Sequence, residues 1–240
     1  MGSDGSYLRS APLTDRELSR QVRGPRMWPS VLNNWYRNDA FQAGRLNLSQ
    51  FAGPGHWNDP DSLLVGLPGL SLTQQRTQFT MWSMMNAPLI AGNRLDTMPG
   101  EVAAILLNLD IIGLNQDSEA LQGRRVQHDG PKTTFADVYK DPLVRWEREV
   151  WAKPLAGGAL ALALVNHANA SATVSAALRA VAAVFPGHAP GHATYTAREL
   201  WTNATASVAA TGTLSHAVEG MGVAVFRLEP QSGHRRNISG

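Results

Sequence analysis

The hydrophobic pattern of the chain changes at about Gly123, and this change limits the possible folds more than any other feature. Before it, short apolar segments alternate with amphipathic helical stretches, the order that builds βαβ units and a parallel sheet. After it, apolar residues recur at every second position in short runs separated by Gly- and Pro-containing turns, which predicts an antiparallel β-sandwich. We therefore expect an irregular leader over residues 1–27, an α/β part over 28–121, a sandwich over 122–230 and a tail over 231–240.

Three amphipathic stretches predict helices in the α/β part. One is expected from about Trp28, because a proline is tolerated in the first turn of a helix. Ser71 and Gln74 form a capping box, which predicts a second helix ending near Asn86. A third is expected from about Pro99. The expected buried faces are, in chain order, Trp28, Val31, Leu32 and Trp35; Leu72, Phe79, Trp82 and Met85, joined by Met81 and Met84; and Val102, Ile105, Leu106 and Leu109.

Short apolar runs predict strands on both sides of Gly123. These runs are residues 50–52 and 89–92 in the α/β part, and 160–164, 196–201 and 223–225 in the sandwich part. Residues 111–114 form a further short apolar segment. The alanine-rich segment 176–184 fits either a strand or a helix, and propensity alone does not decide between them.

Charge and composition exclude several classes of function. The 240 residues include 21 Lys and Arg and 19 Asp and Glu, so the formal net charge is only +2. Outside Arg124-Arg125 and residues 234–236 the basic residues are scattered, and we expect no nucleic-acid partner. No apolar run reaches the ~18 residues of a membrane-spanning helix, and residues 1–27 lack the apolar core of a signal peptide. Neither a membrane partner nor export is predicted.

Metal and cofactor chemistry is not indicated either. The chain has no cysteine, which excludes disulfides, a thiol nucleophile and Cys-zinc sites. The histidines show no metal-ligand spacing, and the sequence contains no Walker loop and no dinucleotide-binding fingerprint. We therefore expect no cofactor and no metal.

Residues 52–61, Ala-Gly-Pro-Gly-His-Trp-Asn-Asp-Pro-Asp, form the densest group of candidate binding residues. Two glycines flank a proline, so the chain can turn sharply there. Asn58, Asp59 and Asp61 are expected to project close together, with the ring of Trp57 beside them. Carboxylates and an amide bind hydroxyl groups directionally, and an aromatic ring stacks on the C–H face of a sugar. A purely structural turn uses the same residue types, so residue type alone does not establish a sugar site.

The order of residues in 52–61 closely resembles that in the α-galactosidases and α-N-acetylgalactosaminidases of glycoside hydrolase family 27. The resemblance extends from about Trp28 to about Pro230. Further matching segments are residues 69–71, 87–89, 115–117, 121–123 and 150–155. The resemblance implies a (β/α)8 (TIM) barrel followed by an antiparallel β-sandwich. It also implies hydrolysis of terminal α-D-galactosyl residues by a retaining two-carboxylate mechanism.

The length of the α/β part limits what the resemblance implies. A (β/α)8 barrel takes about 250 residues, and about 200 at the least. Only residues 1–121 precede the expected sandwich. We therefore expect the C-terminal part of a barrel, too short to close, joined to a C-terminal sandwich.

Neither catalytic carboxylate of the family is expected in this chain. A retaining glycosidase needs two carboxyl groups about 5–5.5 Å apart. The resemblance places the nucleophile in a Lys-x-Asp strand ahead of every matching segment, and the acid/base Asp four residues after an arginine. Arg20 matches this arginine, which binds the sugar in the family, but the residue four positions later is Gly24. If no gap is allowed in the comparison, Arg23 stands where the Asp is needed. We therefore name no catalytic residue and expect the chain alone to be inactive.

The resemblance nevertheless implies a sugar-facing rim. Its substrate-binding residues are Asp61, which lines the galactose pocket, Asp59 and Asn58, which fix the turn, and Trp57 and Arg20. The family usually has Met after the last Asp of the motif, and Ser62 in this chain changes the expected shape of the pocket.

Two hypotheses of different class remain open on the sequence. The first is an α-galactosidase-like hydrolase of which the chain is the C-terminal part, with α-N-acetylgalactosaminidase as an alternative specificity. The second is a non-catalytic carbohydrate-binding or structural remnant of that family. Its sandwich would bind sugars through exposed aromatics, for which Trp146, Trp151 and Trp201 are available, although the last two stand in apolar strands and are expected in the core. Under both hypotheses the expected ligand is a carbohydrate.

Overall fold

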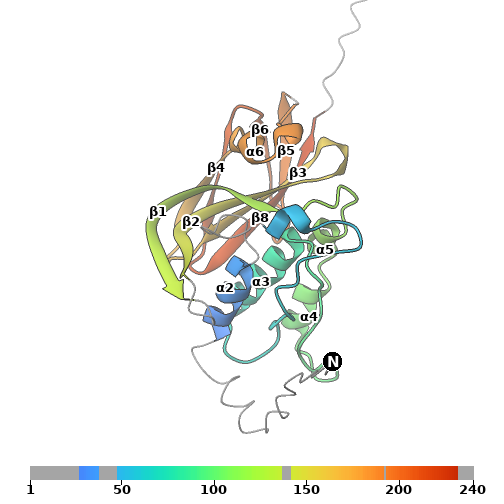
Figure 1. Ribbon diagram of the computed structural model, residues 1–240, viewed down its shortest axis with the longest axis vertical. Coiled ribbons are helices and arrows are strands. Elements are labelled where there is room, and N and C mark those ends of the chain that lie inside the picture. Colours follow the sequence, from blue (N-terminus) through green and yellow to red (C-terminus); the bar gives the residue numbers. More distant parts are fainter. Residues whose placement is uncertain (1–26, 38–47, 137–141, 192, 232–240) are drawn as a thin grey trace, which may run out of the picture.

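The computed structural model describes residues 27–37, 48–136, 142–191 and 193–231. Arg20, the rest of the expected leader up to residue 26, and residues 232–240 of the expected tail lie outside this part. Figure 1 shows the helices of the N-terminal half grouped beneath the curved strands of the C-terminal half. The described chain therefore has a helical layer and a layered β-structure, in the order that the sequence predicts.

The predicted helices are all present. The first, α2 (Met27–Arg37), buries all four residues of its expected face. The second, α3 (Leu72–Met84), begins with the predicted capping box, in which Gln74 N–H donates to the Ser71 hydroxyl and Ser71 N–H donates to Gln74 Oε1. The third, α4 (Gly100–Leu106), begins directly after Pro99. Amphipathic periodicity and capping residues were sufficient to locate these helices.

Two leucines expected in the buried faces are exposed instead. Leu72 is 39% exposed and stands at the first position of α3. Leu109 is 80% exposed because it does not belong to α4. The Asn108 side chain accepts hydrogen bonds from two backbone N–H groups and starts a separate helix, α5 (Leu109–Asn115). This cap places Leu109 out of register with the buried side of α4.

The short strands expected in the α/β part are not formed. Residues 48–51 make a 3₁₀ helix, η1 (Leu48–Phe51), and residues 111–114 belong to α5. Residues 89–92 are largely exposed, and Ala91 makes a single parallel bridge with Leu63. A strand needs a hydrogen-bonded neighbour along its length. Within the described ranges, this bridge is the only parallel pairing, so the expected parallel sheet is represented by one contact.

The C-terminal half is an antiparallel two-sheet structure, as predicted. The strands of the larger sheet, in spatial order, are β1 (Arg124–Ala136), β2 (Pro142–Pro154), β3 (Leu160–Asn166), β8 (Gly222–Pro230), β5 (Thr194–Glu199) and β6 (Thr205–Ala209). The smaller sheet pairs β4 (Ala172–Ala177) with β7 (Thr213–Val218). Single turns η2 (Ala156–Gly158) and η3 (Pro186–His188) lie in the connections. The alanine-rich segment is divided, since its first residues end β4 and later ones form the short helix α6 (Ala180–Val184).

The larger sheet is a shared middle layer between two hydrophobic cores. On β3, Leu160, Leu162 and Leu164 pack toward the smaller sheet. The intervening residues Ala161, Ala163 and Val165 belong to the core formed with the helices, together with Trp35, Trp82 and Trp151. Side chains alternate across a strand, so one segment serves both cores. Small residues on the helical side leave room for the large aromatic rings.

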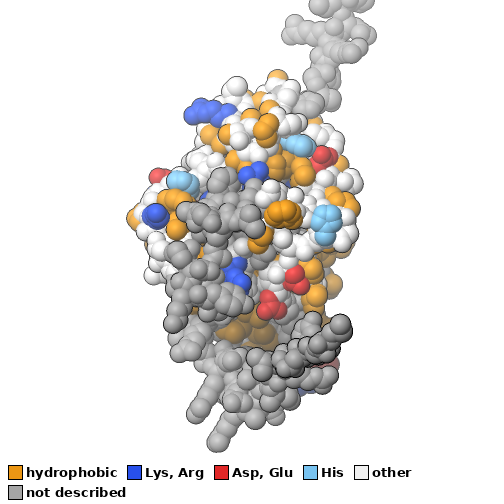
Figure 2. All heavy atoms as spheres, viewed as in Figure 1, with side chains coloured by type: hydrophobic (Ala, Val, Ile, Leu, Met, Phe, Trp, Pro, Cys, Tyr) orange, Lys and Arg blue, Asp and Glu red, His pale blue; other side chains and the backbone are white. Residues whose placement is uncertain are grey.

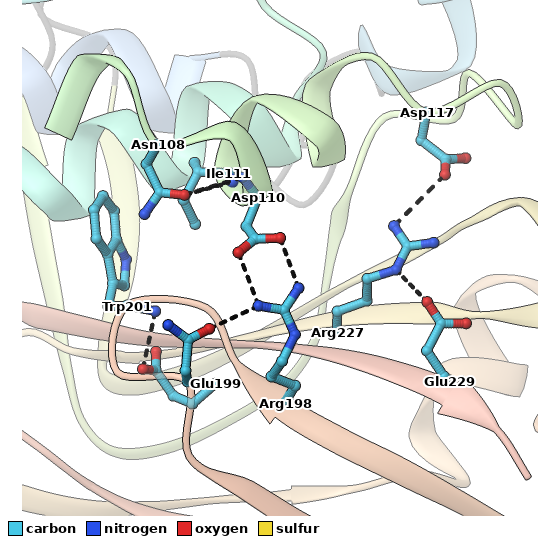
Figure 3. Close-up of polar contacts among 10 residues, drawn as sticks. Asn108, Asp110, Ile111, Asp117, Arg198, Glu199, Trp201, Arg227 and Glu229 are labelled. Atoms are coloured by element: carbon cyan, nitrogen blue, oxygen red, sulfur yellow. Dashed lines mark hydrogen bonds and ion pairs between the residues drawn. The ribbon is translucent and has the colours of Figure 1, made fainter. Parts of the chain in front are cut away.

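Polar contacts also join α5 to the larger sheet (Figure 3). Arg198 on β5 makes a two-pronged ion pair with Asp110 at the start of α5, with N–O distances of 2.6 and 2.8 Å, and also donates to Asn203. Beside this pair, Arg227 on β8 lies 4.0 Å from Asp117 and bonds Glu229. The hydrogen bonds from Arg198 lower the pKa of Asp110. The helical layer is thereby tied to the sheet by charge as well as by apolar contact.

Substituting Arg198 by Ala is expected to lower the free energy of unfolding by about 1 kcal/mol, because both partners of this ion pair are partly exposed. The effect should shrink at about 1 M salt, which screens exposed charges. Urea unfolding at low and high salt measures both, with the exposed Arg179→Ala as control. A loss of equal size for the two variants would show that the Arg198–Asp110 pair does not stabilise the contact.

Candidate functional site

The glycine-proline turn of the motif 52–61 is tight. Gly53 and His56 exchange two backbone hydrogen bonds of 2.8 and 3.0 Å, with Pro54 and Gly55 between them. Gly55 has φ 87°, a conformation that residues with a Cβ rarely adopt. Pro54 precedes it with the fixed φ that such turns favour. The turn therefore reverses the chain just before the polar residues of the motif.

Asp59 holds Asp61 in an uncommon backbone conformation. Asp59 Oδ1 accepts a 2.8 Å hydrogen bond from the N–H of Asp61, and Asp61 has φ 75°, the left-handed region. The carbonyl oxygen of Asp61 accepts a 2.7 Å hydrogen bond from the indole of Trp82, which is fully buried in α3. The Asp61 carboxylate is exposed and accepts from the N–H of Ser62. A non-glycine residue in this region costs roughly 1–3 kcal/mol, and such strain is typical of binding and catalytic sites.

Asn58 braces the turn through its side-chain amide. Its amide donates to the carbonyl oxygen of Leu48 at 2.8 Å and to the buried side chain of Gln122 at 2.7 Å. Gln122 belongs to residues 121–123, another of the segments in which the sequence resembles the family. The family-matching Asn115 likewise donates to the carbonyl oxygen of Ala87. Several matching residues thus bond one another and hold the loops together.

Asp117 acts as a turn residue, because its side chain accepts hydrogen bonds from the backbone. Its Oδ1 accepts from the N–H of Glu119 at 3.0 Å and from the N–H of Ala156 at 2.9 Å. The second bond connects the end of the helical part to the loop after β2. Asp117 is therefore a structural link between the two halves.

Trp57 faces a cavity of about 490 Å³. The ring is 38% exposed, and the cavity is also lined by residues 86–89, residues 115–117 and Ala120. Asp61 does not line it. The Trp57 ring therefore lines this cavity, whereas the exposed Asp61 carboxylate lies outside its lining. Arg20, the remaining candidate, lies outside the described residues.

Two buried glutamines of α3, which the sequence analysis did not single out, support the segment after Asp61. Gln78 accepts a 2.9 Å hydrogen bond from the N–H of Leu64, and Gln75 accepts a 2.8 Å bond from the N–H of Gly66. They are 1% and 6% exposed. They are one helical turn apart, so they face the same way. The sequence feature that could have indicated their role is the spacing of the two glutamines, i and i+3, beside an apolar helix face.

Replacing Gln78 by Leu is expected to lower the free energy of unfolding by about 1–3 kcal/mol, because the Leu64 N–H is left without its acceptor. Chemical unfolding of the two proteins measures the loss. Arg76→Leu, at an exposed position of the same helix, tests whether the effect is only one of helix propensity. A Gln78 variant as stable as the wild type would mean that the Leu64 N–H finds another acceptor.

Lys153 is a fully buried cation at the boundary between the helices and the sheet. From β2 its ammonium donates to Ser83 O and Asn86 Oδ1 near the C-terminal end of α3, and to Leu114 O near the C-terminal end of α5. Helix C-termini carry partial negative charge and favour a cation. Burial nevertheless lowers the pKa of Lys153 to about 7, against a smaller opposing effect of Asp117. The sequence signal was one lysine directly after the apolar run Val150-Trp151-Ala152.

A second buried polar cluster fixes α2 to the sheet. Glu149 on β2 accepts four hydrogen bonds, from Arg125 and the Trp146 N–H on one oxygen, and from Tyr36 and the Trp151 indole on the other, at 2.8 to 3.0 Å. Burial by itself raises the pKa of Glu149, but His167 and the charge of Arg125 outweigh it and hold the pKa at about 2.

His167 completes this cluster as a neutral ring. Since the Tyr36 hydroxyl donates to Glu149, it accepts from His167 Nε2 at 2.8 Å, so Nε2 carries the proton. Nδ1 has no hydrogen-bond partner among the residues that the structure describes. Burial lowers the pKa of His167.

The three tryptophans considered for sugar binding differ in environment. Trp151 is fully buried, as expected. Trp201 is partly buried, and its indole donates to the Thr80 hydroxyl at 3.1 Å. Trp146 is also partly buried, with the His128 ring stacked on it at 3.8 Å and the Arg125 guanidinium 4.6 Å from its centre. Trp201 and Trp146 therefore retain accessible surface.

The described part of the chain has no group of three or more His, Asp or Glu side chains arranged to hold a metal ion. None of its helices is long and apolar enough to cross a membrane. On the face shown in Figure 2, basic and acidic side chains are interspersed and form no extended patch of one sign.

Two family models match the chain. Residues 25–117 match the model described as alpha galactosidase A, and residues 146–228 match the alpha galactosidase C-terminal beta sandwich domain. An alpha-galactosidase of Oryza sativa subsp. japonica is 33% identical over 203 residues, which are 85% of this chain and 41% of the relative. The alpha-N-acetylgalactosaminidase of Homo sapiens is 42% identical over 118 residues, 48% of this chain and 27% of the relative.

The fold agrees with these matches. The structure of an alpha-galactosidase from Saccharomyces cerevisiae with raffinose superposes with a TM-score of 0.64 at 23% identity, covering 77% of this chain and 49% of that one. The chain thus spans less than half the length of these relatives. The two models match in chain order, and the fold is a partial TIM barrel followed by a C-terminal β-sandwich. The chain therefore belongs to glycoside hydrolase family 27.

Proposed function

We propose that this chain forms part of an α-galactosidase-type site, in which Asp61 binds the hydroxyl groups of a terminal α-galactosyl residue. The observation that carries the proposal is the backbone of Asp61, held in the left-handed region by Asp59 and Trp82 with its carboxylate exposed. Asn58 positions the turn, and Trp57 contributes apolar surface. In this proposal the sequence divides near residue 121 into a barrel part and a sandwich part.

The proposed substrate class follows from the relatives. The rice relative is an alpha-galactosidase, and the yeast structure contains raffinose. The second candidate is a terminal N-acetylgalactosaminyl residue, favoured by the 42% identity to the human alpha-N-acetylgalactosaminidase. Both ligands present ring hydroxyls to the same carboxylate, so the role of Asp61 is common to the two.

The Asp61→Asn substitution is expected to weaken binding of methyl α-D-galactopyranoside at least about tenfold, because hydrogen bonds to a charged group are lost. Asn tolerates the left-handed backbone, so the turn itself should persist. Titration calorimetry measures the affinity. Asp129→Asn, an exposed carboxylate on β1, serves as the control. Unchanged affinity in Asp61→Asn would refute the proposed role.

Turnover is a separate test of the same site. Because Arg23 or Gly24 stands at the acid/base position of the family, we expect no release of p-nitrophenol from a p-nitrophenyl α-galactoside by this chain alone. Release that Asp61→Asn abolishes would show that a complete catalytic pair is present and would overturn this expectation.

A further inference from the structure

A cleft of about 170 Å³ lies between the first turns of α3 and the sheets, apart from the motif 52–61. Its walls include Thr73 and Arg76 on α3, Trp201 after β5, His216 on β7 and Glu219 after it. None of these residues takes part in the proposed rim. The cleft is smaller than the about 300–1,000 Å³ of pockets for drug-sized ligands, which limits an occupant to about one ring.

Two polar side chains in the cleft are available to a ligand. Arg76 is exposed, and the one interaction of its side chain with other described residues is with the Trp201 ring, 5.6 Å from the guanidinium carbon. The His216 ring packs edge-on against Phe226 at 5.3 Å, and its nitrogens form no hydrogen bond within the described chain. The guanidinium supplies donors, and the imidazole supplies a donor and an acceptor.

The acidic groups fix which ligands fit. Glu219 accepts from the Thr73 hydroxyl through Oε2, and its other oxygen has no partner in the described part of the chain. Glu199 is already occupied by three backbone N–H groups and the Thr202 hydroxyl, and Figure 3 shows its carboxylate turned to the backbone of Trp201. The charges of Arg76 and Glu219 offset each other, so the cleft has no net attraction for an anion. A neutral group that both accepts and donates hydrogen bonds suits this pair.

Trp201 gives the cleft a rigid apolar wall. Its indole is fixed by the Thr80 hydroxyl, and its backbone N–H by Glu199. An ordered aromatic surface costs little conformational entropy on binding. We propose that this cleft is a second carbohydrate-binding site, which holds one neutral sugar ring between Arg76, Glu219 and the Trp201 side chain. It lies where α3 meets the sheets, and its residues need no contribution from Asp61.

The test follows the indole N–H signal of Trp201 by protein-observed NMR, with the signal assigned by Trp201→Phe. Methyl α-D-galactopyranoside, added up to roughly 100 mM, is expected to shift it saturably with a dissociation constant on the order of millimolar. Arg76→Ala and Glu219→Gln should each raise that constant about tenfold. The exposed Arg179→Ala is the matched control and should leave it unchanged.

Two further arms separate this site from the rim. In Asp61→Asn the Trp201 shift should persist with the wild-type constant, even though rim binding is lost. Galacturonate should bind more weakly than the galactoside, because its carboxylate meets Glu219. Any one of four outcomes would overturn the proposal. These are the absence of a saturable shift, a dissociation constant of Arg76→Ala equal to that of the wild type, loss of the shift in Asp61→Asn, and tighter binding of galacturonate than of the galactoside. The galactoside is chosen from the proposed function, whereas the site rests on its own residues.

Discussion

Glu149→Gln is expected to lower the free energy of unfolding by about 3–5 kcal/mol, the usual range when one partner of a buried charged pair is removed. Each carboxylate oxygen accepts two hydrogen bonds, so either orientation of the new amide places its NH2 against two donors. The charge of Arg125 would also be left buried without its counterion. Urea unfolding followed by circular dichroism measures the loss, and Glu147→Gln on the same strand is the control.

The pH dependence of stability provides a second measurement for Glu149. Its pKa is about 2 in the folded protein and 4.5 ordinarily, so the unfolded chain binds more protons between these values. The stabilisation is complete above about pH 4.5 and falls by about 3 kcal/mol as the pH drops toward 2. The variant should lack this part of the acid sensitivity. Parallel acid profiles of the two proteins would contradict the assigned cluster.

Lys153 should give stability that increases with pH on the alkaline side. Its pKa is about 7 in the folded protein and 10.5 ordinarily, so between these values the unfolded chain binds more protons. The free energy of unfolding should therefore rise with pH from about 7 upward, by about 2–3 kcal/mol to pH 9, and reach a plateau above about 10.5. Below pH 7 both states are protonated and the contribution is constant.

The Lys153→Met variant isolates this effect, because it retains an unbranched chain of similar length without a titrating group. Subtracting its unfolding free energy from that of the wild type at each pH should leave the predicted rise. Lys132→Met, on the exposed part of β1, controls for a general effect of removing a lysine. A difference curve that is flat from pH 7 to 10 would show that the buried amine stays fully protonated at its three carbonyl acceptors.

The parts of the fold that depend on local pattern were predictable. The periodic faces of α2 and α3, the capping box of α3 and the strands β3, β5 and β8 all follow from residues adjacent along the chain. The strands predicted at residues 50–52 and 89–92 were wrong, because a strand forms only where a neighbouring strand supplies hydrogen bonds. Leu109 was misplaced because Asn108 starts a new helix, an event that periodicity does not register.

The candidate site was only partly predictable, for a related reason. The motif 52–61 indicated a turn with polar residues, and Asp59 and Asp61 are indeed linked there. The direction of the Asn58 side chain is decided by Gln122, 64 residues away. Likewise Tyr36 bonds Glu149 across 113 residues. From the sequence alone, such polar residues are expected to be exposed to solvent. Their burial depends on hydrogen-bond partners far along the chain, which local spacing does not reveal.

The alternation along β3 means that the boundary between the two sequence patterns is not a boundary between independent folding units. If the chain were cleaved near residue 121, the sheet would keep its strands but expose Ala161, Ala163 and Val165, and the helices would lose the surface that covers Trp35 and Trp82. Heat or denaturant should accordingly melt both halves in a single cooperative step. If either half were replaced by a half from another protein during evolution, the new half would have to fit the face of β3 that carries Ala161, Ala163 and Val165.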